Sequence, residues 1–373
     1  MKRSIIESIG LSTPDFKYAQ DEIYSFMAEA HELNLNEKKR LKKIYEGSGI
    51  EFRYSVLQDY NKTKGDFLFY GNESGLEPFP GTRLRSSIFE KESIPLAIKA
   101  YHNCIQSLPD FDKHSITHLI TVTCTGLHAP GLDIELVEAL GLRPETERMS
   151  INFMGCYAAF NALKAADYIV KSDSENRVLI VHVELCTLHF QKENFLQNWI
   201  SNALFGDGSA AVLVSSPDKA HKNSRSMEIH GFYNLLFLEG KKEMSWAVGN
   251  HGFEMNLGTH VSKKIKSSIK SVANNLLAKH HTKFQEIEHF AIHPGGRRIL
   301  EVAEDELGFH AGPEHPSYKT LRNYGNLSSA TIFFVLAELM DQIHQKNRNP
   351  GKIMSFAFGP GLSFESLLLE SLS

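Results

Sequence analysis

Three side chains in this sequence could together perform nucleophilic chemistry: Cys156, His293 and Asn326. Cys156 lies in the segment NFMGCYAA (residues 152–159), between a short β-branched run and a stretch with helical spacing. This pattern places a thiol at a strand-to-helix turn. The free N–H groups and partial positive charge of a helix start lower the pKa of a nearby thiol. We therefore expect Cys156 to be a nucleophile that iodoacetamide labels well below pH 8.

His293 and Asn326 also lie beside glycine, at the ends of apolar segments. His293 ends a predicted buried strand, and the proline and glycines that follow it in AIHPGG (residues 291–296) force a turn. Asn326 lies in NYGNLSSA (residues 323–330), just before a predicted helix. Most of the 18 histidines must be surface or satisfied core residues, and an asparagine before a helix is usually a cap. Because both residues could act together with Cys156, we favour a catalytic role for His293 and Asn326.

The composition excludes several classes of protein. A chain of 373 residues with 42% hydrophobic content can bury a large core, and its net charge of −4 offers no basic field for nucleic acid. The first residues lack the apolar run of a signal peptide, and no stretch reaches the roughly 18 apolar residues of a membrane span. We expect a cytoplasmic protein without membrane insertion. Its four cysteines show no Cys-x-x-Cys spacing, so neither a disulfide framework nor a metal site is expected.

The sequence also contains an internal duplication. An apolar strand at 116–123 is followed by Cys156, 38 residues after His118, and a second at 287–293 is followed by Asn326, 37 residues after His289. Another apolar strand follows each predicted helix. Continuous apolar strands alternating with helices indicate α/β sheets covered on both faces. We predict two similar halves, residues 1–216 with the cysteine and residues 217–373 with the histidine and asparagine.

Five motifs in order make the chain resemble the type III polyketide synthases, the chalcone-synthase-like family, over nearly its whole length. Any one of them alone would be weak evidence. The resemblance implies a thiolase-like α/β fold, a duplicated αβαβα layered architecture with two pseudo-symmetric halves. The motifs are Gly155-Cys156, LFGDG (residues 204–208), HPGG (residues 293–296), GNLSSA (residues 325–330) and FGPGL (residues 358–362).

The resemblance implies a decarboxylating condensation of CoA thioesters. Cys156 would carry the acyl group as a thioester with His293 as its imidazolium partner, while the His293 N–H and the Asn326 amide would hold the enolate oxygen formed from malonyl-CoA. Phe205 would stand between the pocket and the CoA tunnel. Neither a metal nor an organic cofactor is required. The family's basic helix would bind the CoA phosphates through Arg40 and Lys43; its third basic position is Gly47 here, and a merely solvated helix face is the alternative.

Cavity positions suggest the substrate. The set Thr125, Ala129 and Cys186 is similar to that of bacterial alkylpyrone-forming members, whose narrow apolar tunnel takes a long acyl starter. Trp246 would close the pocket that takes an aromatic starter in plant enzymes. We therefore predict an alkylpyrone or alkylresorcinol synthase acting on fatty acyl-CoA. The remaining predicted substrate-binding residues are Met255, Gly359, Pro360 and Gly361.

Other assignments stay open. A small phloroglucinol- or naphthalene-type product is the alternative within the family. An initiating 3-oxoacyl-ACP synthase uses the same three residue types, although its histidine usually sits in a His-Gln-Ala-Asn sequence and its chain is shorter. A more distant alternative is a non-catalytic thiolase-fold partner subunit. The duplication and the resemblance also imply a homodimer, with Ala129 near the interface but not inserted into the partner.

Overall fold

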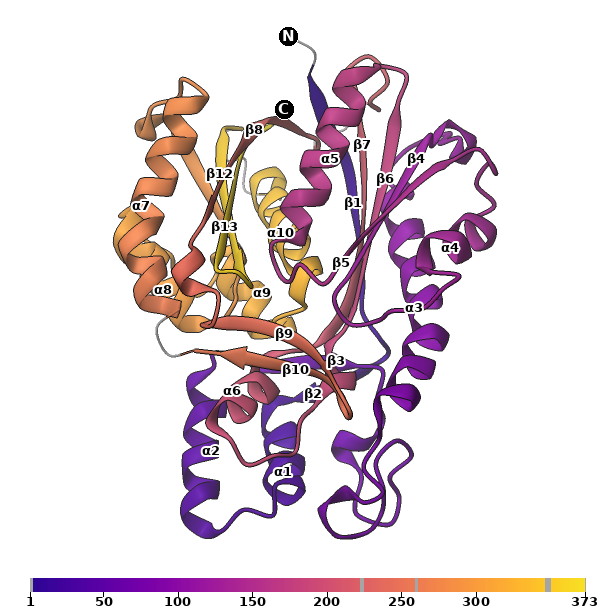
Figure 1. Cartoon of the computed structure of the whole chain (residues 1–373). Coiled ribbons are helices and arrows are strands. Elements are labelled where there is room, and N and C mark those ends of the chain that lie inside the picture. Colours follow the sequence, from indigo (N-terminus) through magenta and orange to yellow (C-terminus); the bar gives the residue numbers. More distant parts are fainter. Residues whose placement is uncertain (1–2, 222–224, 259–260, 346–349, 373) are drawn as a thin grey trace.

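The apolar segments of the chain form one nine-stranded mixed sheet (Figure 1). The computed structural model describes residues 3–221, 225–258, 261–345 and 350–372. From one edge of the sheet to the other, the strands are β11 (Ile287–Ile292), β12 (Lys352–Gly359), β13 (Ser363–Ser371), β8 (Met227–Leu236), β1 (Ser4–Ser12), β7 (Asp207–Ser215), β6 (Arg177–Leu185), β4 (His118–Thr123) and β5 (Glu147–Asn152).

The sheet contains the predicted duplication. β4 runs parallel to β6, and β6, β7 and β1 then pair antiparallel; β11, β12, β13 and β8 repeat this order in the second half. The two copies meet at a short antiparallel pairing of Ser4–Ile6 with Met227–Ile229. The sequence did not predict this seam. It makes a single sheet out of what the duplication alone would leave as two.

Helices fill the remaining layers. α5 (Ala158–Ser172) and α10 (Thr331–Gln345) share one buried cluster with the inner faces of both half-sheets. α3 (Thr82–Ile105) packs on the outer face of the first half, with α4 (Leu132–Leu140) beside it. α7 (Val261–Lys279) and α8 (Arg297–Leu307) cover the second half. The order is therefore α, β, α, β, α, as predicted, with α5 and α10 in the centre of Figure 1.

Shorter elements cover one end of this layered body, below the sheet in Figure 1. α2 (Leu35–Gly47) is the helix that carries Arg40 and Lys43, and it begins where the Asn34 side chain accepts hydrogen bonds from the N–H groups of Asn36 and Glu37 (3.0 and 3.1 Å). This end of the molecule holds the cavity described below. Its elements are β2 (Phe16–Ala19), α1 (Gln20–Ala30), α2 (Leu35–Gly47), β3 (Phe52–Ser55), α6 (Leu196–Leu204), β9 (Met244–Gly249), β10 (Gly252–Leu257) and α9 (Pro316–Tyr324).

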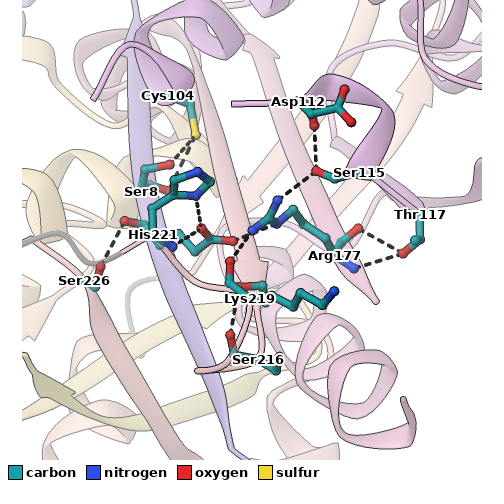
Figure 2. Close-up of polar contacts among 12 residues, drawn as sticks. Ser8, Cys104, Asp112, Ser115, Thr117, Arg177, Ser216, Lys219, His221 and Ser226 are labelled. Carbon is teal, nitrogen blue, oxygen red and sulfur yellow. Dashed lines mark hydrogen bonds and ion pairs between the residues drawn. The ribbon is translucent and has the colours of Figure 1, made fainter. Parts of the chain in front are cut away.

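A buried ionic cluster fixes the segment that leaves the first half (Figure 2). The fully buried carboxylate of Glu7 on β1 accepts from Arg177 Nε at 3.0 Å and from both the backbone N–H and the ring Nδ1 of His221, each at 3.0 Å. Arg177 also donates to Ser115 Oγ at 2.8 Å and to the Lys219 carbonyl. Because each of these buried charges has partners, the contacts hold residues 216–221 against β1 and β6.

Candidate active site

The three predicted residues line a single cavity of about 330 Å³. Cys156 lies in the turn between β5 and α5, His293 follows β11, and Asn326 precedes α10. Each is placed at the carboxyl end of a strand or at the start of a helix, where side chains from both halves converge. The pseudo-symmetry of the sheet therefore brings together groups separated by up to 170 residues of sequence.

Two glycines allow the Cys156 turn to pack against the turn after β12. Gly155 has a φ of +83°, and a Cβ there would lie 2.4 Å from Pro360 Cδ. A Cβ at Gly359 would lie 2.5 Å from the Tyr157 ring and 3.5 Å from the Cys156 backbone nitrogen. Both positions require glycine because any side chain would push the two turns apart. The glycines thus set the position of the thiol relative to the second half.

The amide of Asn326 is oriented by its own helix start. Its Oδ1 accepts hydrogen bonds from the Ser328 N–H at 2.9 Å and the Thr331 hydroxyl at 3.3 Å. Cys156 Sγ lies 3.9 Å from Asn326 Nδ2. With Oδ1 engaged as an acceptor, the NH₂ group is the one free to donate towards the thiol and the cavity. Asn326 therefore closes the turn that precedes α10 and is a cavity donor at the same time.

His293 is 1% exposed, and its backbone N–H donates to the Phe356 carbonyl of β12 at 2.8 Å. Within the described part of the chain, neither of its ring nitrogens has a hydrogen-bond partner. A buried imidazole without partners is unusual in a folded protein. Since His293 lines the cavity, a bound substrate is the partner that this ring is placed to meet.

Burial sets the ionisation of the site. It raises the pKa of Cys156 to about 12, with the nearby Glu184 carboxylate as a second cause, and it lowers the pKa of His293 to about 3. The expectation of a lowered thiol pKa and a thiolate–imidazolium pair is therefore wrong. The loss of hydration raises the pKa of the thiol more than the helix start lowers it. At neutral pH the thiol and the imidazole are both uncharged.

A buried carboxyl behind the thiol was not singled out in the sequence. Glu184 ends β6, is fully buried, and accepts from the Cys124 N–H at 2.9 Å, the Thr125 hydroxyl at 3.1 Å and the Ser329 hydroxyl. Burial raises its pKa to about 7, and these hydrogen bonds oppose the rise. The available signal was a glutamate inside the mostly apolar run of residues 178–185.

Most of the predicted substrate-binding residues line the same cavity. Thr125 and Pro360 lie on its wall. Trp246 is held by a hydrogen bond from Nε1 to the Cys124 carbonyl at 2.7 Å. A second, narrower hollow of about 30 Å³ adjoins the first. The residues that border both are Phe205, Cys186, Trp246 and Met255.

Other predicted positions lie elsewhere. Ala129 is exposed and borders a separate hollow with Leu127 and Ile134, so it does not line the cavity of its own chain, contrary to the tunnel prediction. Gly359 and Gly361 belong to the supporting turn, with Pro360 alone of the three on the cavity wall. Arg40 and Lys43 are exposed on α2 and do not line the cavity, although the neighbouring residues Ile44, Gly47 and Ser48 do.

Comparison with known proteins agrees with this architecture. The family described as chalcone and stilbene synthases matches the chain through its N-terminal domain at residues 2–218 and its C-terminal domain at residues 230–373. The chain belongs to this family. Its relatives are type III polyketide synthases, which are condensing acyltransferases, so the protein is an enzyme of that class.

Individual relatives are similar over the whole chain. "Probable polyketide synthase 1" of Dictyostelium discoideum is 30% identical over 99% of this chain, which spans about a tenth (11%) of that protein. "Alpha-pyrone synthesis polyketide synthase-like Pks18" of Mycobacterium tuberculosis is 28% identical over 98% of this chain and 91% of its own length.

A solved structure of PKS-I from the brown alga Ectocarpus siliculosus superposes with a TM-score of 0.91 at 27% identity, covering 100% of this chain and 99% of that one. The predicted thiolase-like α/β fold of a type III polyketide synthase is therefore confirmed. None of the helices in the described ranges has the length and apolar character that crossing a membrane requires.

The ionisation of the site predicts a pH profile for thiol alkylation. In the free enzyme, iodoacetamide should modify Cys156 slowly up to pH 8 and faster only in alkaline solution, because the neutral thiol persists. Glu184 is charged above its pKa of about 7 and then opposes thiolate formation, so Glu184→Gln should move the Cys156 profile to lower pH. Peptide mass spectrometry against pH measures both rates.

Cys104 serves as the internal control, because burial also raises its pKa to about 12 and it packs against Ser8 of β1, outside the cavity. Its profile should not change in Glu184→Gln. Rapid labelling of wild-type Cys156 at pH 7 would contradict the neutral-thiol assignment.

Proposed function

We propose that this type III polyketide synthase loads an acyl group from acyl-CoA onto Cys156 and extends it with malonyl-CoA by decarboxylative condensation. The observation that carries the proposal is the convergence of a thiol, an imidazole without partners and an oriented amide on one enclosed, largely apolar cavity. Such a site holds a thioester away from water and stabilises an enolate with neutral donors. No metal or organic cofactor takes part in either step.

Loading begins with neutral groups. As the Cys156 sulfur attacks the thioester carbonyl, its proton passes to the neutral His293 ring, and the C–S bond to CoA breaks. The imidazolium then returns that proton to the departing CoA thiolate. The raised thiol pKa and the lowered imidazole pKa mean that the ion pair forms only during attack. The free thiol thus stays protonated between turnovers.

Extension uses the same site in a different way. When the bond between the malonyl carboxylate and its α-carbon breaks, CO₂ leaves and negative charge develops on the thioester oxygen. The His293 N–H and the Asn326 Nδ2–H group are the donors that would hold this oxygen. The enolate carbon then attacks the acyl group on Cys156, which forms a C–C bond and breaks the thioester C–S bond. The sulfur leaves as a thiolate and takes up a proton from water before the next loading step.

Cys156→Ala should abolish condensation, because no thioester can form, while malonyl-CoA decarboxylation survives in part through His293 and Asn326. Product mass spectrometry and CO₂ release measure the two activities separately. Cys104→Ala is the matched control and should retain both, since Cys104 lies outside the cavity. Condensation at the wild-type rate in Cys156→Ala would refute the role of the thiol.

For the starter, we propose a long unbranched fatty acyl chain and an alkylpyrone or alkylresorcinol product. Cys186 and Trp246 belong to the largely apolar wall of the main cavity, so an acyl chain attached to Cys156 would lie in apolar surroundings there. Each methylene buried there contributes about 0.8 kcal/mol, which favours long starters. The alpha-pyrone synthesis named for the mycobacterial relative supports the same product class.

Cys186→Phe should therefore raise KM for long-chain acyl-CoA steeply and leave butyryl-CoA nearly unaffected, because the added ring occupies cavity space that only a long chain needs. Ala129→Phe introduces the same ring outside the cavity and should leave chain-length selectivity unchanged. Steady-state kinetics over a series of starters measures both variants. If Cys186→Phe loses long and short starters equally, a small phloroglucinol- or naphthalene-type product replaces the long-chain assignment.

We also propose that the enzyme is a homodimer that pairs through β5. This strand ends the sheet, so one side of its backbone has no strand partner in the described chain, and most of its residues are exposed. Met149 on β5 and the neighbouring Ile134 and Leu127 are apolar and 45–48% exposed. An open edge beside apolar side chains suits a second copy of the same chain.

Light scattering should give the mass of a dimer, and Met149→Asp should shift it towards the monomer by placing a charge in the interface. Leu68→Asp is the control, since Leu68 is 70% exposed and lies outside this edge, and it should leave the mass unchanged. A wild-type monomer at micromolar concentration would rule out the dimer.

A further inference from the structure

The cavity opens to the surface between α2, α7 and α8, and its only cationic lining residues in the described part of the chain are Arg297 and Arg298. They are the first two residues of α8, directly after the His293–Gly296 turn. The deeper wall, near Cys156 and Trp246, consists mainly of apolar side chains. Positive charge is therefore confined to the entrance, on the segment that also carries His293.

The opposite side of the entrance lacks a cation where the family's basic helix would supply one. Gly47 lines the cavity, and a Cβ built there would meet no atom within 4 Å. The stem of Arg297 lies against the end of the same helix, because a Cβ at Gly49 would be 3.3 Å from Arg297 Cδ. The side chain of Arg297 thus packs against the segment that directly follows α2. Arg40 makes a cation–π contact with Trp199, in which its guanidinium carbon lies 5.8 Å from the centre of the ring.

The arginine pair keeps an excess of positive charge. Arg297 Nε and Arg298 Nη1 both donate to the single carboxylate of Glu301, at 3.0 and 3.1 Å. One anion cannot neutralise two guanidinium groups, and both side chains stay more than half exposed (53% and 67%). The free N–H groups at the start of the 11-residue helix α8 add to the positive field. Planar guanidinium groups are well suited to bidentate contacts with phosphate.

We propose that Arg297 and Arg298 bind the phosphate groups of the CoA thioester, in place of the cation that α2 lacks at Gly47. This inference rests on the proposed function of the cavity as a site for CoA thioesters. The phosphates stay at the exposed entrance while the pantetheine arm passes between Gly47 and α8 to Cys156. Arg297 and Arg298 therefore determine affinity for the carrier and do not take part in bond making.

The test compares malonyl-CoA with malonyl-N-acetylcysteamine, a thioester without phosphates. Arg297→Ala/Arg298→Ala should raise KM for malonyl-CoA by roughly 10- to 100-fold, the loss expected for hydrogen bonds to charged groups, with kcat nearly unchanged. KM for malonyl-N-acetylcysteamine should not change. Malonyl-dephospho-CoA, which lacks the 3′-phosphate, identifies the phosphate concerned. If the double alanine variant raises KM for it as much as for malonyl-CoA, the arginines bind the pyrophosphate. If KM rises less, they bind the 3′-phosphate. The lysine pair at the same positions should recover part of the affinity.

Arg3→Ala is the matched control. Arg3 is also an exposed arginine (61%) in an ion pair with one glutamate, Glu228 of β8, at 3.0 Å, and it does not line the cavity. It should leave both KM values unchanged. The proposal is overturned if the double alanine variant keeps the wild-type KM for malonyl-CoA, or if KM rises equally for the phosphate-free thioester.

Calorimetric titration with CoA itself separates this inference from the proposed reaction. If the wild type condensed neither thioester, the proposed function would fail, but the two arginines would still be tested by binding. Weaker CoA binding in the double alanine variant than in the wild type and Arg3→Ala supports their role. Equal binding in all three proteins overturns it.

Discussion

The contact between two turns, one from each half of the chain, is the constraint on which the site depends. Gly155 and Gly359 let the Cys156 turn and the turn after β12 approach to a distance that no side chain would allow. The same approach brings the helix starts of α5 and α10 together, so that the thiol of one half faces the amide of the other. The positions of Cys156 and Asn326 are thus consequences of backbone packing between pseudo-symmetric halves.

The burial of Cys156 and His293 away from water is the second determinant of the chemistry of the site. A helix start favours a thiolate, but the enclosed cavity disfavours every charge, and the second effect is the larger one at Cys156 and His293. Neutral groups suit a cycle in which proton transfer accompanies bond making. Glu184 also affects the ionisation of the thiol. Burial raises the pKa of its carboxyl to about 7, and hydrogen bonds oppose this rise.

The sequence predicted the features that local patterns encode. Alternating apolar strands and helices indicated α/β sheets covered on both faces, and the repeated spacing before Cys156 and Asn326 indicated the duplication. The αβαβα order and the common site of the three residues were implied by the resemblance to the family. The sequence did not predict the β1–β8 seam, which depends on pairing between residues more than 200 positions apart. The pKa of Cys156 was wrongly predicted because burial is a property of the assembled cavity. Arg297 and Arg298 were missed because a basic pair beside a glycine turn is indistinguishable from ordinary surface charge until the entrance is formed.

The place of β1 in the sheet has a consequence for how the chain reaches its native state. β1 lies between β7 and β8, which are made roughly 200 residues after it. Until those strands leave the ribosome, both edges of β1 lack their native partners. Closing such long loops is entropically costly and slows folding. The architecture that aligns the two halves of the site therefore delays completion of its central strand until β8 has been made, more than 200 residues after β1.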